Sequence, residues 1–411
     1  MSEADLNNTS VASLRSQQLA LHALVYLDEE NQVVIGRRDI DSYGVFPPDG
    51  AALLRRLEER GSPSEAAAWY ARTYGESVDI GAFVKMLDEL GFVRAGGSPA
   101  GAPPGRLRGQ RLGQLLFSWP AHALYAAIVA VAVCAAVVHP WLAPLPHHLI
   151  FCGSLVVVEL TVVSGQALLA LVHEGFHVLA GRRLGLRTRV RASRRLYYVV
   201  YETGLDGLVS VPRSRRYLPI LAGLLADVLC MALLTLAAVA ARGSGPNPDL
   251  FARVCLALVV STLPRIAWQF YLFLETDIYH LVNVASGCYD LRGATRRLLA
   301  RAGRRALGRP GAAEEAIDAD PRDLRIARWY APVFVAGYLW SAATLVLLMA
   351  PLAWHFADQM VGNLSSGALG RNPDAATVLA LNTTQLAIAA WIALRDRRAA
   401  HSTHVTKGSL A

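Results

Sequence analysis

The feature that most constrains the fold of this chain is a series of about six apolar stretches, each long enough to cross a lipid bilayer. A membrane-spanning helix needs about 20 predominantly apolar residues. The stretches lie near residues 118–140, 149–180, 217–241, 250–275, 330–354 and 375–395. Charged residues make up only 18% of the chain, below the roughly 25% of soluble domains. The sequence therefore predicts a multi-pass α-helical membrane protein, with about six transmembrane helices in a domain over residues 115–396.

Residues 17–95 are more polar, and they predict a small soluble α/β domain of winged-helix-like type. The elements expected are strands at Leu21–Leu27 and Gln32–Gly36, and helices near Ala51–Glu59, from Pro63 and after Asp79. The second helix has a clear start, because Ser62-Pro63-Ser64-Glu65 is a capping box with proline in the first turn.

Three further segments are expected to lack a fold of their own. Residues 1–16 are polar and have no apolar run of a signal peptide, so they are predicted to be a disordered tail. Residues 96–114 are rich in Gly, Pro and Arg and predict a linker. Residues 397–411 are predicted to be a second tail.

The loops between the apolar stretches alternate in charge. Arginines crowd residues 181–216 and 292–328, whereas residues 139–148 have no Lys or Arg and residues 242–249 have only Arg242. The positive-inside rule then places both termini and the soluble domain in the cytoplasm. The same rule accounts for the net charge of +8, so a nucleic-acid partner is not predicted.

The segment His173-Glu174-Gly175-Phe176-His177 is the strongest indication of chemistry. Residues four apart share one face of a helix, so both imidazoles can reach the same Zn²⁺, with Glu174 beside them as general base. Ionisable residues inside an apolar helix are costly unless they have a function. The pattern predicts a zinc site with His173 and His177 as ligands and Glu174 as the catalytic base.

Catalytic zinc usually has three protein ligands, and two aspartates compete for the third position. Asp206 follows soon after the motif, in the arginine-rich loop, whereas Asp277 is expected to end the fourth membrane helix. By the topology above, the second and fourth helices run in the same direction, so His177 and Asp277 arrive at the same membrane depth. We therefore expect Asp277 to be the third ligand.

Other polar residues inside or next to the apolar stretches need partners or roles. Arg265 is expected to pair with Glu159 or Asp227, since buried charges require partners. Asp227, Tyr279 and His280 are further candidates for contacts to the zinc ligands or to the substrate.

These motifs together resemble the site-2 protease family of intramembrane zinc metallopeptidases. Glu275–Tyr279 followed by Gly287–Arg292 is similar, more narrowly, to a bacterial branch that matures peptides, as are Tyr217–Gly223 and Asp227. The chain differs from the wider family at Ile278, where the family has glycine, and at Leu224, where it has proline. The resemblance implies a zinc endopeptidase embedded in the inner membrane of a bacterial cell, with its active site toward the cytoplasm.

The N-terminal pattern of two strands, a Pro-Asp-Gly turn and three helices resembles the PqqD-like domains that bind leader peptides of ribosomally made natural products. The resemblance implies that residues 17–95 bind the leader of a precursor peptide. Addition of the leader to a sheet edge would provide such binding.

The expected function is therefore removal of a leader from a ribosomally synthesised, modified peptide, with lipid, precursor peptide and an exporter or modifying enzymes as partners. Two alternatives stay open. One is a site-2-type protease that cleaves a membrane signalling protein, and the other is a non-catalytic scaffold that delivers precursor peptide to an exporter.

Overall fold

The computed structural model describes most of the chain between residues 19 and 349. The described ranges are 19–29, 32–40, 42–59, 62–94, 107–195, 198–204, 206–242, 248–288, 290–308 and 321–349, with single helical positions between 351 and 395. The chain divides into two compact units. The N-terminal unit comprises Met1–Leu115, Val178–Arg189 and Gly204–Arg216, and the helical unit comprises Leu116–His177, Val190–Thr203 and Tyr217–Ala411.

The N-terminal unit begins with a three-stranded antiparallel sheet in the order β1-β2-β3. The strands are β1 (Val25–Glu29), β2 (Gln32–Arg37) and β3 (Ser42–Phe46). The two predicted strands are present, but β1 starts at Val25 rather than Leu21, because Leu21 forms an isolated bridge with Val93 instead. The third strand was not predicted, since its five residues include a glycine and carry no clear alternation.

Three helices follow the sheet, as the sequence predicts: α2 (Pro48–Glu58), α3 (Pro63–Tyr74) and α4 (Ile80–Glu89). The capping box of α3 is confirmed, because the Ser62 hydroxyl accepts from the backbone of Glu65 and the Glu65 carboxylate accepts from the backbone of Ser62. The Asp79 carboxylate caps α4 in the same way. Helices α3 and α4 therefore begin at residues that satisfy free backbone amides, whereas α2 starts after Pro47 without a side-chain cap.

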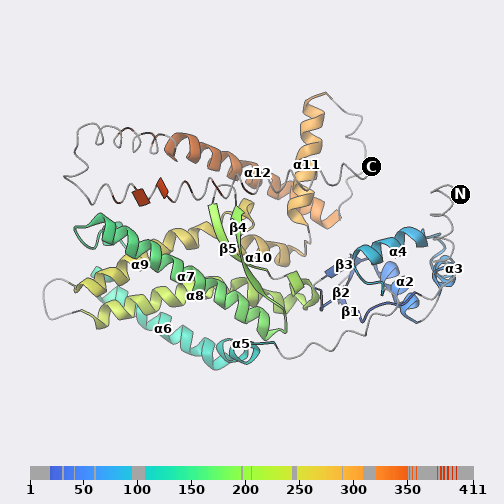
Figure 1. The fold of residues 1–411 in the computed structure, drawn as a ribbon, viewed down its shortest axis with the longest axis horizontal. Coiled ribbons are helices and arrows are strands. Elements are labelled where there is room, and N and C mark those ends of the chain that lie inside the picture. Colours follow the sequence, from blue (N-terminus) through green and yellow to red (C-terminus); the bar gives the residue numbers. More distant parts are fainter. Residues whose placement is uncertain are drawn as a thin grey trace. The chain divides into compact units, whose positions relative to one another are not determined.

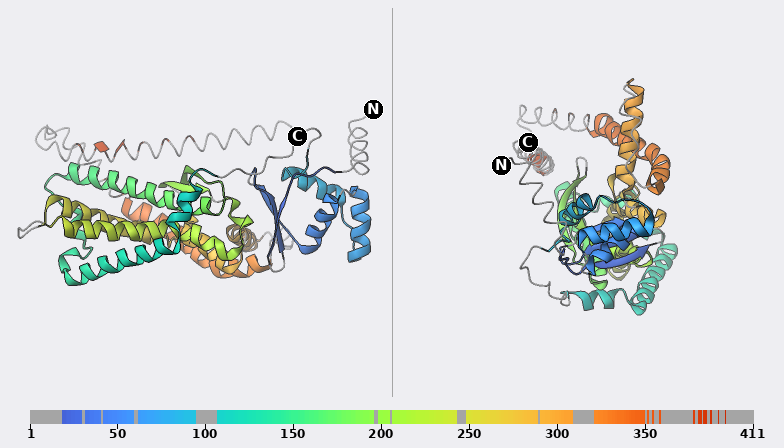
Figure 2. Two further views of the ribbon diagram at one scale, coloured as in Figure 1. Left: turned by 90° about the horizontal axis from the view of Figure 1, so that it is seen from below. Right: turned by 90° about the vertical axis from the view of Figure 1, so that its right-hand side faces the viewer.

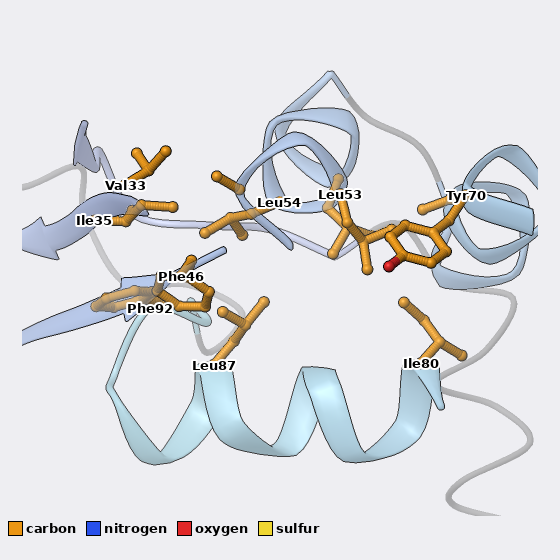
Figure 3. Close-up of a cluster of buried hydrophobic side chains, with 12 residues drawn as sticks. Val33, Ile35, Phe46, Leu53, Leu54, Tyr70, Ile80, Leu87 and Phe92 are labelled. Carbon is orange, nitrogen blue, oxygen red and sulfur yellow. The ribbon is translucent and has the colours of Figure 1, made fainter. Parts of the chain in front are cut away.

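The core of the N-terminal unit lies between the sheet and the three helices (Figure 3). Ile35 from β2, Leu54 from α2, Leu87 from α4 and Phe92 are all completely buried. At the other end of the core the Tyr70 hydroxyl donates to the Asp49 carboxylate, and this hydrogen bond raises the pKa of Tyr70 to about 12.

The N-terminal unit also includes the 3₁₀ helix η3 (Asp206–Ser210), which packs against all three strands. The guanidinium of Arg216 forms an ion pair with Glu29 of β1 and donates to the carbonyls of Val209 and Val211. Arg187 donates to the carbonyl of Asp39. Part of the arginine-rich segment 181–216 therefore belongs to the fold of this unit.

Within the described part of the chain, five helices are long and apolar enough to span a membrane. They are α6 (Trp119–Val138), α7 (Leu155–Arg183), α8 (Arg213–Ala240), α9 (Leu250–Trp268) and α12 (Pro321–Thr344), which continues as a π-helical turn to Met349. They correspond to five of the six predicted spans. The sixth, at 375–395, lies largely outside the described residues.

Helices α7, α8 and α9 run side by side in the helical unit (Figure 1 and Figure 2). The Gln166 side chain of α7 donates to the hydroxyls of Ser261 and Thr262 on α9. Gly165 lets α7 approach α9 closely, because a Cβ there would lie 2.4 Å from Leu258. Small and polar side chains at helix contacts are typical of membrane bundles.

The chain after α9 differs from the prediction. The fourth span was expected to continue to about residue 275 and to end at Asp277, but α9 stops at Trp268. A 3₁₀ turn, η4 (Leu272–Leu274), follows, and Glu275 adopts a left-handed conformation with φ 56°. Asp277 is therefore the first residue of a new helix, α10 (Asp277–Ser286), rather than the last of α9.

Helices and strands are also present in segments that the sequence predicts to be loops or linker. The arginine-rich loop contains the two-stranded sheet of β4 (Arg189–Arg195) and β5 (Tyr198–Gly204). The arginine-rich segment after Gly287 contains α11 (Leu291–Ala306), which packs on α12. The predicted linker 96–114 overlaps the short helix α5 (Gln110–Leu116). Gly113 allows α5 to pack closely against the backbone of Leu179. In each of these segments, the high content of charged residues favoured a loop prediction over secondary structure.

We expect Leu54→Ala to destabilise the N-terminal core by about 2–5 kcal/mol, because the substitution leaves a cavity. Hydrogen exchange of the slow amides of α2 and α4 in the full-length protein should accelerate about 30-fold or more. Arg56→Ala, on the exposed side of α2, should leave these rates nearly unchanged. Equal rates in wild type and Leu54→Ala would contradict the described core.

Candidate metal centre

The two histidines of the α7 motif face the same point inside the helical unit. The distance between His173 Nε2 and His177 Nε2 is 3.2 Å, and the two side chains are buried. This is the expected result of a four-residue spacing on one helix face. Glu174 lies between them in sequence and is also buried.

Asp277, at the first position of α10, completes the group. Its Oδ2 atom is 3.2 Å from His173 Nε2 and 3.2 Å from His177 Nε2. The three atoms therefore form a nearly equilateral triangle. Among the described residues, this is the one set of three or more His, Cys, Asp or Glu side chains whose donor atoms converge in this way.

Hydrogen bonds on the other ring nitrogens orient both imidazoles. His173 Nδ1 donates to Asp227 Oδ2 at 3.0 Å, and His177 Nδ1 donates to the carbonyl of Pro219 at 2.7 Å; both partners lie on α8. When the proton is on Nδ1, each neutral imidazole presents a lone pair at Nε2. With neutral imidazoles, two Nε2 lone pairs and one carboxylate oxygen then meet at 3.2 Å, an arrangement that could hold a cation.

The dimensions of the triangle suit zinc. Two ligands at ordinary Zn–N and Zn–O distances in a tetrahedral site lie about 3.3 Å apart, which matches the observed 3.2 Å edges. Two imidazoles and one carboxylate leave the fourth position of a tetrahedron for water or substrate. The donor set and its spacing thus fit a zinc ion.

A buried ion pair supports the His173 side. Arg265 on α9 donates to Asp227 Oδ1 at 2.6 Å, while the other oxygen of Asp227 accepts from His173. The predicted pairing of Arg265 is therefore confirmed, with Asp227 as the partner. Because Asp227 is only 1% exposed, its charge depends on these two contacts.

The break after α9 fixes Asp277. The Gln269 side chain accepts from the backbone amide of Asp277 at 3.1 Å, and the Gln269 carbonyl accepts from the Thr276 hydroxyl at 2.6 Å. Gln269 therefore caps α10 from the end of the preceding helix. The Tyr330 hydroxyl of α12 donates to the Leu272 carbonyl and holds the intervening turn.

The Glu174 carboxylate has a polar side-chain partner that the sequence does not predict. The Thr203 hydroxyl, at the end of β5, donates to Glu174 Oε2 at 2.6 Å. No local sequence signal marks Thr203, because it approaches Glu174 only through the unpredicted two-stranded sheet. The carboxylate is thereby held in a fixed orientation at the start of the motif.

Gly223 of α8 lies directly against the donor triangle. A Cβ atom at this position would be 2.3 Å from His173 Nε2 and 2.3 Å from His177 Nε2. No side chain fits there without displacing an imidazole. By contrast, a Cβ at Gly175, within the motif itself, meets nothing within 4 Å.

The other candidate residues lie outside the triangle. The buried Tyr279 hydroxyl accepts from the backbone amide of Arg292, which ties α10 to α11. His280 follows Tyr279 on α10 and lines a cavity beside that helix. Asp206, the competing third ligand, begins η3 in the N-terminal unit.

Comparison of the chain with protein-family profiles, with curated proteins and with solved structures found no match. The description of the candidate metal centre therefore rests on the contacts of this chain alone.

Replacement of Gly223 by alanine tests whether the donor triangle binds zinc. We expect purified Gly223→Ala protein to fall from about one bound zinc per chain to almost none by elemental analysis, because the methyl group displaces both imidazoles. Gly175→Ala is the matched control and should keep its zinc. Full zinc occupancy in Gly223→Ala would contradict the described packing of α8 on the histidines.

Replacement of Asp227 tests the orientation of His173. Asp227→Asn should weaken zinc affinity about 10–100-fold in competition with a chromophoric chelator, the usual cost of losing a carboxylate behind a ligating histidine. Asp323→Asn makes the same change at another buried carboxylate, which accepts from the Asp290 amide, and should leave the affinity unchanged. An equal loss in both variants would indicate general destabilisation instead.

Proposed function

We propose that this chain is a membrane-embedded zinc endopeptidase that removes the leader from a ribosomally made, modified precursor peptide. The observation that carries the proposal is the convergence of His173, His177 and Asp277 at 3.2 Å, with the buried Glu174 adjacent to His173 in the motif. The five apolar helices support a membrane setting. The arginine-dense segments favour a site that opens toward the cytoplasm of a bacterial cell.

Under this proposal each polar residue has a defined task. His173, His177 and Asp277 would hold a zinc ion, which when bound would acidify a water and polarise the scissile carbonyl. Glu174 accepts a proton from the attacking water and transfers it to the leaving amine. Asp227 and the Pro219 carbonyl hold the Nδ1 protons, so that His173 and His177 keep Nε2 directed at the metal position. Thr203 orients the Glu174 carboxylate for the proton transfer.

The N-terminal unit would supply substrate recognition. Among the described residues, β1 and β3 are the two edges of its sheet, and an extended leader can pair with such an edge through backbone hydrogen bonds. Tethering of the leader would raise the local concentration of the scissile segment. Partners of this kind include the precursor peptide and the enzymes that modify or export it.

The central test is the catalytic base. Glu174→Gln should keep its zinc but cleave about 10²–10⁴-fold more slowly, since the amide cannot accept the proton. The measurement is mass spectrometry of short peptides encoded beside the gene of this chain, incubated with the full-length protein in nanodiscs. Cleavage within twofold of wild type would exclude the hydrolytic mechanism.

The third ligand is tested with the same preparation. Asp277→Ala should lose both zinc and cleavage, whereas Asp206→Ala should keep both. The reverse pattern would transfer the ligand role to Asp206. Retained zinc in all variants without any peptide cleavage would favour the scaffold alternative.

A further inference from the structure

A cavity of about 500 Å³ lies beside α10 and α11 in the helical unit. Its lining is almost entirely polar or charged and includes Glu275, His280, Asn283, Asp290, Arg292 and Arg296. It is distinct from the donor triangle, because neither histidine of the α7 motif lines it. The turn Glu275-Thr276-Asp277 nevertheless links the two, since its first residue lines the cavity and its last is the candidate ligand.

The cavity is lined by two arginines and two carboxylates, and these do not all pair with one another. Arg292 and Arg296 lie four residues apart on α11 and so share one face, where like charges repel. Glu275 forms an ion pair with Arg292, and Asp290 forms one with Arg297 outside the lining. No described residue forms an ion pair with Arg296, so one cationic group of the lining is left for an anion.

Two buried atoms of the lining residues also lack partners. Neither the Asn283 carbonyl oxygen nor the Arg292 Nε has a hydrogen-bond partner among the described residues. Buried polar atoms are rarely left unsatisfied, so each such case needs a reason. A ligand with N–H donors and anionic oxygens, such as a peptide with an acidic side chain, would satisfy both atoms once the two side chains turn toward it.

The backbone at the cavity is strained. Glu275 is the only non-glycine residue with positive φ in the described part of the chain, and a side chain is disfavoured in this conformation. Strain of this kind often accompanies ligand-binding sites. Here it directs the chain so that Glu275 reaches Arg292 while Asp277 reaches the histidines.

The position of the cavity sets its relation to the metal centre. Asn283 is six residues from Asp277 on α10, which corresponds to about 9 Å at 1.5 Å per residue. An extended peptide covers about 3.3 Å per residue. The cavity is therefore two or three peptide residues from the candidate metal position.

We propose that this cavity is a specificity subsite that binds an acidic side chain of the peptide substrate, two or three residues from the scissile bond. Arg296 is the residue that determines the preference, and Asn283 contacts the adjoining peptide backbone. This inference rests on the proposed peptidase function, because that function supplies the peptide.

The test separates binding from cleavage. A set of labelled 14-residue peptides carries one Glu, Gln or Lys at each position in turn, in an otherwise uncharged sequence. Their affinity for full-length Glu174→Gln protein in phosphatidylcholine nanodiscs is measured by fluorescence anisotropy. The best Glu peptide should bind about tenfold more tightly than its Gln counterpart, as expected for a charge-assisted hydrogen bond. Wild-type protein and the same peptides then give the cleavage sites.

Charge reversal tests whether Arg296 determines the preference for an acidic side chain. Arg296→Glu should abolish the preference for Glu and favour the Lys peptide, whereas Arg304→Glu, an exposed site on the same helix, makes the same charge change and should keep it. Equal affinity for Glu and Gln peptides overturns the subsite, as does loss of the preference in Arg304→Glu alone. Displacement of the peptide by phosphatidylglycerol, with no preference for Glu over Gln, assigns the cavity to lipid headgroups and also overturns it.

The same measurements distinguish failure of the subsite from failure of the proposed peptidase activity. A preference that depends on Arg296, without cleavage of any peptide by the wild type, sustains the subsite while the proposed hydrolysis fails. Cleavage with no preference for an acidic residue sustains the hydrolysis and removes the subsite.

Discussion

Ionisable side chains inside an apolar helix bundle must find their partners within the protein, because lipid offers none. In this chain the requirement is met by a continuous set of contacts from Arg265 through Asp227 to His173. Arg265 neutralises Asp227, and Asp227 takes the Nδ1 proton of His173. The lone pair that remains at Nε2 points toward His177 and Asp277. The geometry of the candidate metal centre therefore depends on an ion pair between two helices, neither of which carries the histidine motif.

The interruption after α9 has a complementary role. A continuous helix through residue 277 would have carried the aspartate past the histidines on a fixed helical path. Instead, α9 ends at Trp268, and a new helix begins at Asp277 with Gln269 as its cap. A carboxylate at a helix N-terminus also benefits from the helix dipole. The break thus positions the third donor and gives its charge a favourable location.

The parts of the fold and site that the sequence could predict are those encoded locally. The apolar lengths predicted α6 to α9 and α12, and the four-residue spacing predicted that His173 and His177 share a face. Contacts between segments that are distant in the sequence could not be predicted from local patterns. Thr203 and Gly223 have no local signature, because their importance comes from the sheet and the helix that bring them to the motif. Asp277 was selected by membrane depth, but it was assigned to the end of α9 instead of the start of α10. No local sequence signal indicates that Glu275 adopts a left-handed conformation and that a new helix begins after it.

The close approach of Gly223 also bears on how chains of this kind could change over evolutionary time. Loss of the donor geometry would not require the loss of any donor, because a single methyl group on α8 disturbs two of the three at once. A descendant with both histidines, the glutamate and the aspartate intact, but with any other residue at this glycine, would keep the motif as a relic. The state of that one position is therefore a better record of whether selection has maintained the centre than the motif itself.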